Sequence, residues 1–164
     1  MVIVMGLPGS GKSYFAHRLS ERLNFHYIGS DEVRQDMETM GKYKNEDKQQ
    51  VYDRMGFLAK KAFQEGKNLI LDATFIKENL RQQFVALALN KHSSYCIIWI
   101  EATEELIKKR ISIKRNDSEA DFKVYLKLSE GFEVPEPPYL KLESKQDNIN
   151  DLLIKAEKYI KAVS

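Results

Sequence analysis

An eight-residue stretch near the start of the chain constrains the fold more than any other feature. Residues 6–13 read Gly-Leu-Pro-Gly-Ser-Gly-Lys-Ser, which fits the spacing G-x-x-x-x-G-K-[ST]. A short apolar run at residues 2–5 precedes the stretch, and apolar residues at helical spacing follow it. A strand, a glycine-rich loop and a helix in this order predict a loop that wraps a phosphate group.

Each residue type in the stretch has a physical reason. Gly6, Gly9 and Gly11 allow backbone conformations that a Cβ would forbid, so the loop can turn its N–H groups inward. A helix that begins near Lys12 adds free N–H groups and the positive end of its dipole. The Lys12 ammonium is expected on the outer phosphates and the Ser13 hydroxyl on Mg²⁺. The predicted cofactors are therefore ATP and Mg²⁺, and the alternative is a glycine-rich turn that binds nothing.

The composition is typical of one folded domain over residues 1–164. Hydrophobic residues make up 43% of the chain, and 26 Lys and Arg against 24 Asp and Glu leave a net charge of +2. This balance gives no general argument for binding to nucleic acid or to a membrane surface. The single cysteine, Cys96, favours a reducing compartment. An apolar strand that begins at residue 2 leaves no room for a signal peptide, and no apolar run approaches the ~20 residues that span a bilayer. We therefore expect a cytoplasmic protein.

Short apolar runs alternate with helical patterns along the chain. The sequence predicts strands at residues 2–5, 26–29, 69–71, 95–100 and 139–142. Such alternation predicts a parallel sheet that is covered by helices on both faces. The first three strands end at Gly6, at Ser30-Asp31 and at Asp72. Because ligands of such sheets bind beyond the C-terminal ends of the strands, these residues are expected at one edge.

A candidate catalytic carboxylate follows the second strand. Asp31 lies there, and Arg34 is one helical turn later on the same face. A carboxylate beside the transferring phosphate can accept the proton of an attacking hydroxyl. The alternative is that Asp31 caps the helix, although Ser30 could cap it equally well. Arg34 is a candidate for holding an anionic group of the acceptor, against the alternative of a solvated or ion-paired arginine.

The end of the third strand and the helix after it carry further candidates. Asp72 ends an apolar strand, which is the usual place for an acidic group near Mg²⁺, although aspartates also begin turns there. Thr74 and Arg81 are candidates for lining the acceptor cleft; the alternative for Arg81 is an exposed position on its helix.

A basic segment near the middle of the chain is the candidate lid. Arg110 and Arg115 precede the acidic residues Glu119 and Asp121. A segment that closes over the nucleotide can stabilise charge on the transferring group and exclude water. The alternative is an ordinary charged helix end. The residues expected to contact the nucleotide are Gly6, Gly9, Ser10, Gly11, Lys12, Ser13, Tyr14, Arg110 and Arg115.

Four motifs occur in a fixed order. They are the stretch at 6–13, Ser30-Asp31-x-x-Arg34, Leu71-Asp72-Ala73-Thr74-Phe75 with Arg81, and the stretch from Arg110 to Arg115. Together, over Met1 to about Glu143, they resemble the AAA-33, or zeta-toxin-like, group of P-loop kinases, and the kinase domain of phage polynucleotide 5′-hydroxyl kinase is similar. The resemblance implies a three-layer α/β P-loop NTPase with a five-stranded parallel sheet and a helical lid at residues 110–128. Phe75 stands where the Asp-x-Thr-Asn pattern of that kinase has its asparagine.

The resemblance also implies roles for single residues. Asp31 matches the general base, Arg34 the arginine that grips the phosphate of the acceptor, and Asp72 the acid that supports the acceptor site. Lys12 and Ser13 match the triphosphate and metal contacts, and Arg115 matches the lid arginine. The expected catalytic residues are therefore Lys12, Asp31 and Arg115, and the expected metal-site residues are Ser13 and Asp72.

Two classes of function fit these motifs. The first is an ATP-dependent phosphotransferase that moves the γ-phosphate to a hydroxyl of a small molecule or of a nucleic-acid 5′ end. The second is a nucleotide-dependent switch that acts on a protein partner. The base-recognition motif Asn-Lys-x-Asp of GTPases is absent, since Asn90-Lys91 is followed by His92-Ser93. A mechanical AAA ATPase would need a helical lid domain for which 164 residues leave no room.

Overall fold

A parallel β-sheet forms the centre of the molecule, which the computed structural model describes over residues 1–37, 45–114 and 118–163. The strands are β1 (Val2–Met5), β2 (His26–Gly29), β3 (Leu69–Asp72), β4 (Cys96–Glu101) and β5 (Leu140–Glu143). Their order in the sheet is β2-β3-β1-β4-β5, and all neighbouring strands are parallel. The predicted five-stranded parallel sheet is confirmed.

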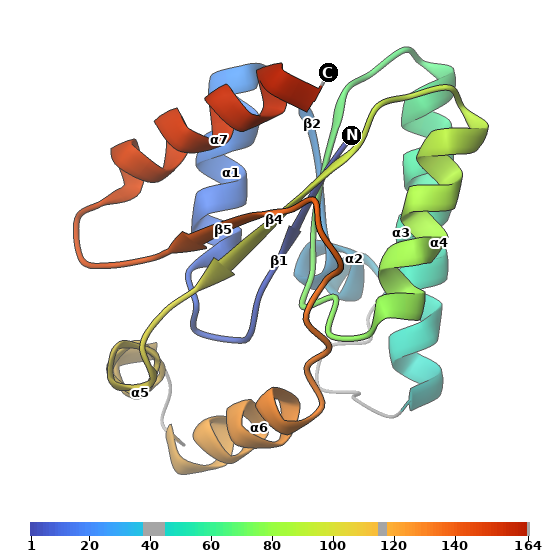
Figure 1. Ribbon diagram of the computed structural model, residues 1–164. Helices are drawn as coiled ribbons and strands as arrows, with labels where there is room; N and C mark the ends of the chain where they lie inside the picture. Colours follow the sequence, from blue (N-terminus) through green and yellow to red (C-terminus); the bar gives the residue numbers. More distant parts are fainter. Residues whose placement is uncertain (38–44, 115–117, 164) are drawn as a thin grey trace.

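Helices cover both faces of this sheet, as Figure 1 shows. The helices are α1 (Lys12–Leu23), α2 (Ser30–Asp36), α3 (Asn45–Gln64), α4 (Glu78–Asn90), α5 (Glu104–Lys114), α6 (Ser118–Glu130) and α7 (Ile149–Val163). On one face, α1 and α7 pack against Val2, Val4 and Ile70, and on the other, α3 and α4 pack against Ile3 and Leu71. Successive strand residues point to opposite faces, so strands covered on both sides are apolar throughout.

The boundaries of several elements differ from the prediction. β4 begins at Cys96, whose N–H donates to the carbonyl of Met1 at 3.0 Å, whereas the preceding Tyr95 is exposed. β5 begins at Leu140, the first residue that pairs with β4, and the preceding Tyr139 ring packs against Trp99 at a centroid distance of 6.0 Å. The helical segment expected to end at residue 128 continues to Glu130 in α6.

Three neighbouring strands end at the same edge of the sheet. Val4 of β1 and Gly29 of β2 both pair in register with Asp72 of β3, so these three strands finish at the same level. Helices α5 and α6 lie beyond this edge (Figure 1). None of the helices in the described ranges is long and apolar enough to cross a membrane.

Candidate active site

The glycine-rich stretch forms the turn between β1 and α1. Gly11 precedes α1 with φ 92°, a left-handed conformation that favours glycine, and α1 begins at Lys12 as predicted. No side chain caps α1, so its first-turn N–H groups are left for an anionic ligand. Lys12 and Ser13 are half-buried at this turn, and Tyr14 is exposed. The Ser10 side chain is fully buried, and its N–H donates to the carbonyl of Leu7 at 3.2 Å.

Asp31 and Arg34 lie in α2, directly after β2. The residue that precedes α2 is Gly29, and no side chain makes a capping hydrogen bond there, so neither Ser30 nor Asp31 acts as the cap. The Asp31 side chain is exposed in the first turn, where the helix dipole stabilises negative charge. Arg34 is partly buried one turn later.

Asp72 is buried at the end of β3 with 3% of its surface exposed. Its Oδ2 accepts a 2.8 Å hydrogen bond from the Tyr27 hydroxyl, and its Oδ1 has no partner among the described residues. Burial, and then the negative charge of Asp72, raise the pKa of Tyr27, with smaller contributions from Glu32 and Asp31. Tyr27 therefore stays protonated and donates, and its hydroxyl lies within electrostatic reach of both candidate aspartates.

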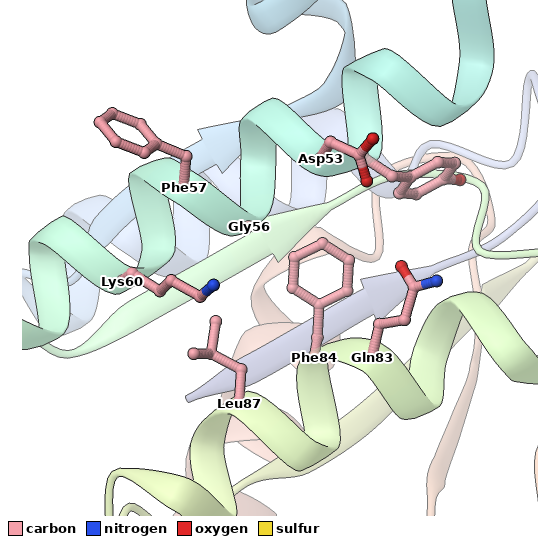
Figure 2. Close-up of a pocket in the computed structure, with 8 residues that line it drawn as sticks. Asp53, Gly56, Phe57, Lys60, Gln83, Phe84 and Leu87 are labelled. Carbon is pink, nitrogen blue, oxygen red and sulfur yellow. The ribbon is translucent and has the colours of Figure 1, made fainter. Parts of the chain in front are cut away.

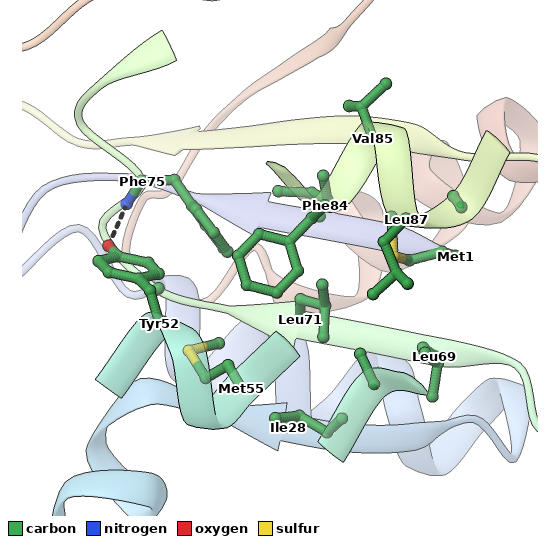
Figure 3. Close-up of a cluster of buried hydrophobic side chains, with 14 of the residues drawn as sticks. Met1, Ile28, Tyr52, Met55, Leu69, Leu71, Phe75, Phe84, Val85 and Leu87 are labelled. Carbon is green, nitrogen blue, oxygen red and sulfur yellow. Dashed lines mark hydrogen bonds between the residues drawn. The ribbon is translucent and has the colours of Figure 1, made fainter. Parts of the chain in front are cut away.

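Thr74 and Phe75 form a turn that joins the loop to α3. The N–H of Gly6 donates to the Thr74 carbonyl at 3.4 Å, and the N–H of Phe75 donates to the Tyr52 hydroxyl at 3.3 Å (Figure 3). The Tyr52 hydroxyl also lies 3.4 Å from Thr74 Oγ1. Burial raises the pKa of Tyr52, while the bonds to Thr74 and Phe75 and the charge of Arg34 act in the opposite direction. Thr74 therefore lies beside the Tyr52 hydroxyl, and the charge of Arg34 acts on the same group.

Arg81 does not line the cleft in this structure. Its side chain is fully buried, and Nη1 donates to the Phe75 carbonyl at 2.6 Å while the guanidinium pairs with Glu78. Phe75 has φ 46°, which is rare for a bulky residue and costs on the order of 1–3 kcal/mol. Arg81 donates to the carbonyl of this strained residue, and Tyr52 accepts from its N–H. Arg81 therefore supports the turn at Phe75.

Arg110 of α5 lies at the glycine-rich loop of residues 6–13, which is expected to bind phosphate. Its Nη1 donates to the carbonyls of Gly9 at 3.3 Å and Ser10 at 3.0 Å, and its Nη2 donates to Ser144 Oγ at 3.0 Å. Burial lowers the pKa of Arg110, although a guanidinium remains charged. Arg115 lies outside the described residues. Within the described ranges, the segment expected to form a lid, residues 110–128, lies in α5 and α6.

The oxygen atoms present at the strand ends suit Mg²⁺. Among the described residues, no three His, Cys, Asp or Glu side chains gather as a metal site. Mg²⁺ does not require such a cage, because it binds few protein oxygens and takes the others from phosphate and water. The Ser13 hydroxyl is partly accessible, and Asp72 Oδ1 is a buried carboxylate oxygen without a hydrogen-bond partner. The donor set therefore fits the ion that the motif implies.

A pocket of about 330 Å³ lies elsewhere, between α3 and α4 (Figure 2). Its walls include Phe57 and Lys60 of α3 and Phe84 and Leu87 of α4. No residue of the 6–13 stretch lines it. The pocket is therefore a surface feature of the helical layer and not part of the nucleotide site.

Three residues of the site escaped the sequence prediction, namely Tyr27, Tyr52 and Ser144. Tyr27 lies two residues before Gly29, so both project to the same face of β2, and a Cβ at Gly29 would overlap the tyrosine ring. The pattern Tyr-x-Gly is therefore a local signal that the tyrosine ring lies over the glycine two residues later. For Tyr52 and Ser144 no local pattern exists, since their partners lie 23 and 34 residues away.

Several solved structures of other proteins share this fold. The chain is similar to APS kinase CysC of Mycobacterium tuberculosis in complex with AMPPNP and APS (TM-score 0.75, 16% identity, 98% of this chain and 96% of that chain covered). It is also similar to a gluconokinase from Sinorhizobium meliloti 1021 (TM-score 0.72, 16% identity, 94% and 87% covered). Kti12 of Chaetomium thermophilum in complex with ADP-AlF3 has a TM-score of 0.71 at 18% identity, with 99% and 98% covered. At these identities the likeness shows a fold shared with P-loop kinases.

Comparison with sequences gives the family. A search of curated proteins finds no match. The family model AAA_33, described as an AAA domain, matches residues 1–135, which is most of the chain and includes the loop at 6–13 and the ends of β2 and β3. The chain therefore belongs to the AAA_33 family.

Proposed function

We propose that this protein is an ATP-dependent phosphotransferase that moves the γ-phosphate of ATP to a hydroxyl group of a small molecule or of a nucleic-acid 5′ end. One observation carries the proposal. The phosphate-binding loop follows β1, Asp31 follows β2 and Asp72 ends β3, and these three strands finish at one edge of the sheet. The kinase structures of the same fold support this reading.

Asp31 is the proposed general base. Its carboxylate is exposed, makes no capping bond and follows the strand next to β3. It can accept the proton of the attacking hydroxyl while Lys12 balances charge on the outer phosphates. Arg115 is proposed to add positive charge from the lid, with Tyr14 and Arg110 near the nucleotide.

Arg34 is proposed to hold an anionic group of the acceptor. Arginine suits a bidentate contact with phosphate or carboxylate, and the charge of Arg34 acts on the hydroxyl of Tyr52, which lies beside Thr74. A nucleotide with a phosphate close to the reacting hydroxyl, or a sugar acid, has this chemistry. Phe75 stands in place of the asparagine of the polynucleotide kinase pattern, and its buried side chain offers no hydrogen-bonding group to a polynucleotide end.

Ser13 and Asp72 are proposed to hold Mg²⁺ together with the phosphates. The ion supplies charge neutralisation and orientation of the phosphate oxygens when it is bound. Tyr27 holds Oδ2 of the Asp72 carboxylate, which leaves Oδ1 directed to another partner.

Transfer from labelled ATP to a panel of sugar acids, nucleosides, nucleotides and 5′-hydroxyl oligonucleotides tests the proposal. We expect a labelled product that depends on one acceptor class and that falls by orders of magnitude in Lys12→Ala, with little change in thermal unfolding. Turnover of ATP that no acceptor stimulates, but that a protein partner does, would favour the switch instead. Lys12→Ala with near-parental transfer would show that this loop is not the catalytic phosphate site.

A further inference from the structure

The guanidinium of Arg110 connects three parts of the chain at the phosphate-binding loop. In addition to Gly9, Ser10 and Ser144 Oγ, it reaches the carbonyl of Lys145 at 3.5 Å. The Ser144 side chain is 8% exposed, and its N–H donates to the carbonyl of Glu101 at 2.7 Å. Arg110 therefore connects the loop to Ser144, which is itself held by a backbone hydrogen bond to the end of β4.

The loop has no space for side chains on this side. A Cβ at Gly11 would lie 3.0 Å from Ser144 Oγ and 3.2 Å from Arg110 Nη1, and a Cβ at Gly9 would lie 2.9 Å from Ile107 Cγ2. Both glycines have positive φ, 80° for Gly9 and 92° for Gly11. The residues of α5 and Ser144 thus fit closely against the backbone of the loop.

The charge of Arg110 faces only neutral oxygen atoms within the described part of the chain. Its acceptors are three carbonyls and one hydroxyl, and no ion pair with a described carboxylate is formed. A partly buried cation without an acidic partner raises the electrostatic potential of the loop, which favours a polyphosphate. Because Arg110 bonds to carbonyls, it occupies none of the N–H groups of the loop.

We propose that Arg110 is a positioning residue that braces the phosphate-binding loop through its carbonyls and Ser144, and so strengthens binding of the polyphosphate rather than of the nucleoside. The inference rests on the nucleotide site of the proposed function and adds the residue that holds that site in shape. It also connects the loop to α5, the first helix of the expected lid.

Calorimetric titration with two probes tests this role. Magnesium ADP carries a nucleoside, and magnesium tripolyphosphate does not. In Arg110→Met we expect both dissociation constants to rise by a similar factor of about ten, the scale of a lost charge-assisted bond. Arg22→Met is the matched control, since Arg22 bonds to Glu157 at 2.6 Å between α1 and α7, and it should leave both constants unchanged. If Arg110→Met weakened the binding of magnesium ADP alone, or of neither probe, the inference would be overturned.

Amide hydrogen exchange of the ligand-free protein separates a brace from a direct phosphate contact. Arg110→Met should speed exchange about tenfold at residues 6–13, including the Ser10 amide that bonds to Leu7. A residue that only contacts the ligand would leave this exchange unchanged, and that result overturns the inference. Arg110→Lys keeps the charge but offers fewer donors, so it should fall between the two forms and exclude a general folding defect.

A double-mutant cycle completes the test. Ser144→Ala alone should weaken both probes about threefold, and it should have no further effect in an Arg110→Met background. Full additivity of the two changes contradicts the brace. If the parental protein binds neither probe, the nucleotide site itself fails and the inference with it. If both probes bind as expected but no acceptor is phosphorylated, the proposed transfer fails while the brace stands.

Discussion

The hydroxyl group of Tyr27 donates a 2.8 Å hydrogen bond to Oδ2 of Asp72. The ring of Tyr27 reaches Asp72 by crossing Gly29, where a Cβ would overlap it. The ring of Tyr27 also stacks on His17 at a centroid distance of 3.9 Å. An α1 side chain, a β2 side chain and the candidate metal-site carboxylate of β3 thus form one connected set.

The raised pKa of Tyr27 predicts a change in stability at alkaline pH. In the unfolded chain its phenol titrates near 10.0, and in the folded protein burial and Asp72 move the pKa upward. The folded protein therefore keeps a proton that the unfolded chain loses, so this contribution is complete below about pH 10 and is lost as the pH rises further. The free energy of unfolding, measured with urea at several alkaline pH values, should fall less steeply in Tyr27→Phe than in the parental protein. Tyr14→Phe, at an exposed position, is the control, and equal slopes for all three would contradict this linkage.

The second prediction concerns Asp31. Asp31→Asn keeps the size of the side chain but cannot take a proton, and the residue makes no capping bond that the amide would disturb. ATP affinity should stay similar while the rate of transfer falls roughly 10²-fold or more, the range for loss of a general base. Calorimetric ATP titration beside a rate assay measures both. A mutant that loses ATP binding together with transfer would point to a metal or structural role.

The third prediction concerns the turn at Phe75. Tyr52→Phe leaves the buried N–H of Phe75 without its acceptor and Thr74 Oγ1 without its neighbour. We expect a loss of about 1–3 kcal/mol in the free energy of unfolding, the cost of an unsatisfied buried group. Tyr159→Phe is the matched control, since Tyr159 lies on α7 away from the site. Because Tyr52 also adjoins Thr74, the KM for the acceptor should rise more than the KM for ATP, and equal effects on both would argue against an acceptor-side position.

The fourth prediction compares two glycines at α3. Gly56 lies within the helix and Gly66 follows it at φ 70°, and a Cβ at either position would meet nothing within 4 Å. Gly56→Ala should therefore stabilise the protein by about 1 kcal/mol through helix propensity. Gly66→Ala should destabilise it by about 1 kcal/mol, because alanine resists positive φ. Urea unfolding measures both, and a destabilising Gly56→Ala would contradict the open space that the structure shows beside Gly56 in the pocket of Figure 2.

Local chemistry made the glycine-rich loop and the common edge of the strand ends predictable. The residues at 6–13 are neighbours in sequence as well as in space, and parallel strands align their ends, so Asp31 and Asp72 were placed at the correct edge. The environment of Arg81 was not predictable in the same way. Its exposure depends on how α4 packs against Phe75, and a helical arginine is usually exposed, whereas this one is fully buried. The bond from Arg110 to Ser144 likewise depends on tertiary contact across the end of the sheet.

The order of the strands has a further consequence. β1 lies in the middle of the sheet, with β2 and β3 on one side and β4 and β5 on the other. The groups proposed for the acceptor come from residues 27–74, whereas the contacts that hold the outside of the loop come from α5 and Ser144. The two halves meet at β1 through backbone bonds such as that from Gly6 to Thr74, which do not depend on side-chain identity. The segment proposed to choose the acceptor can therefore diverge in evolution, or be exchanged by grafting the β2–β3 segment from a relative, while the segments proposed to hold ATP are inherited intact.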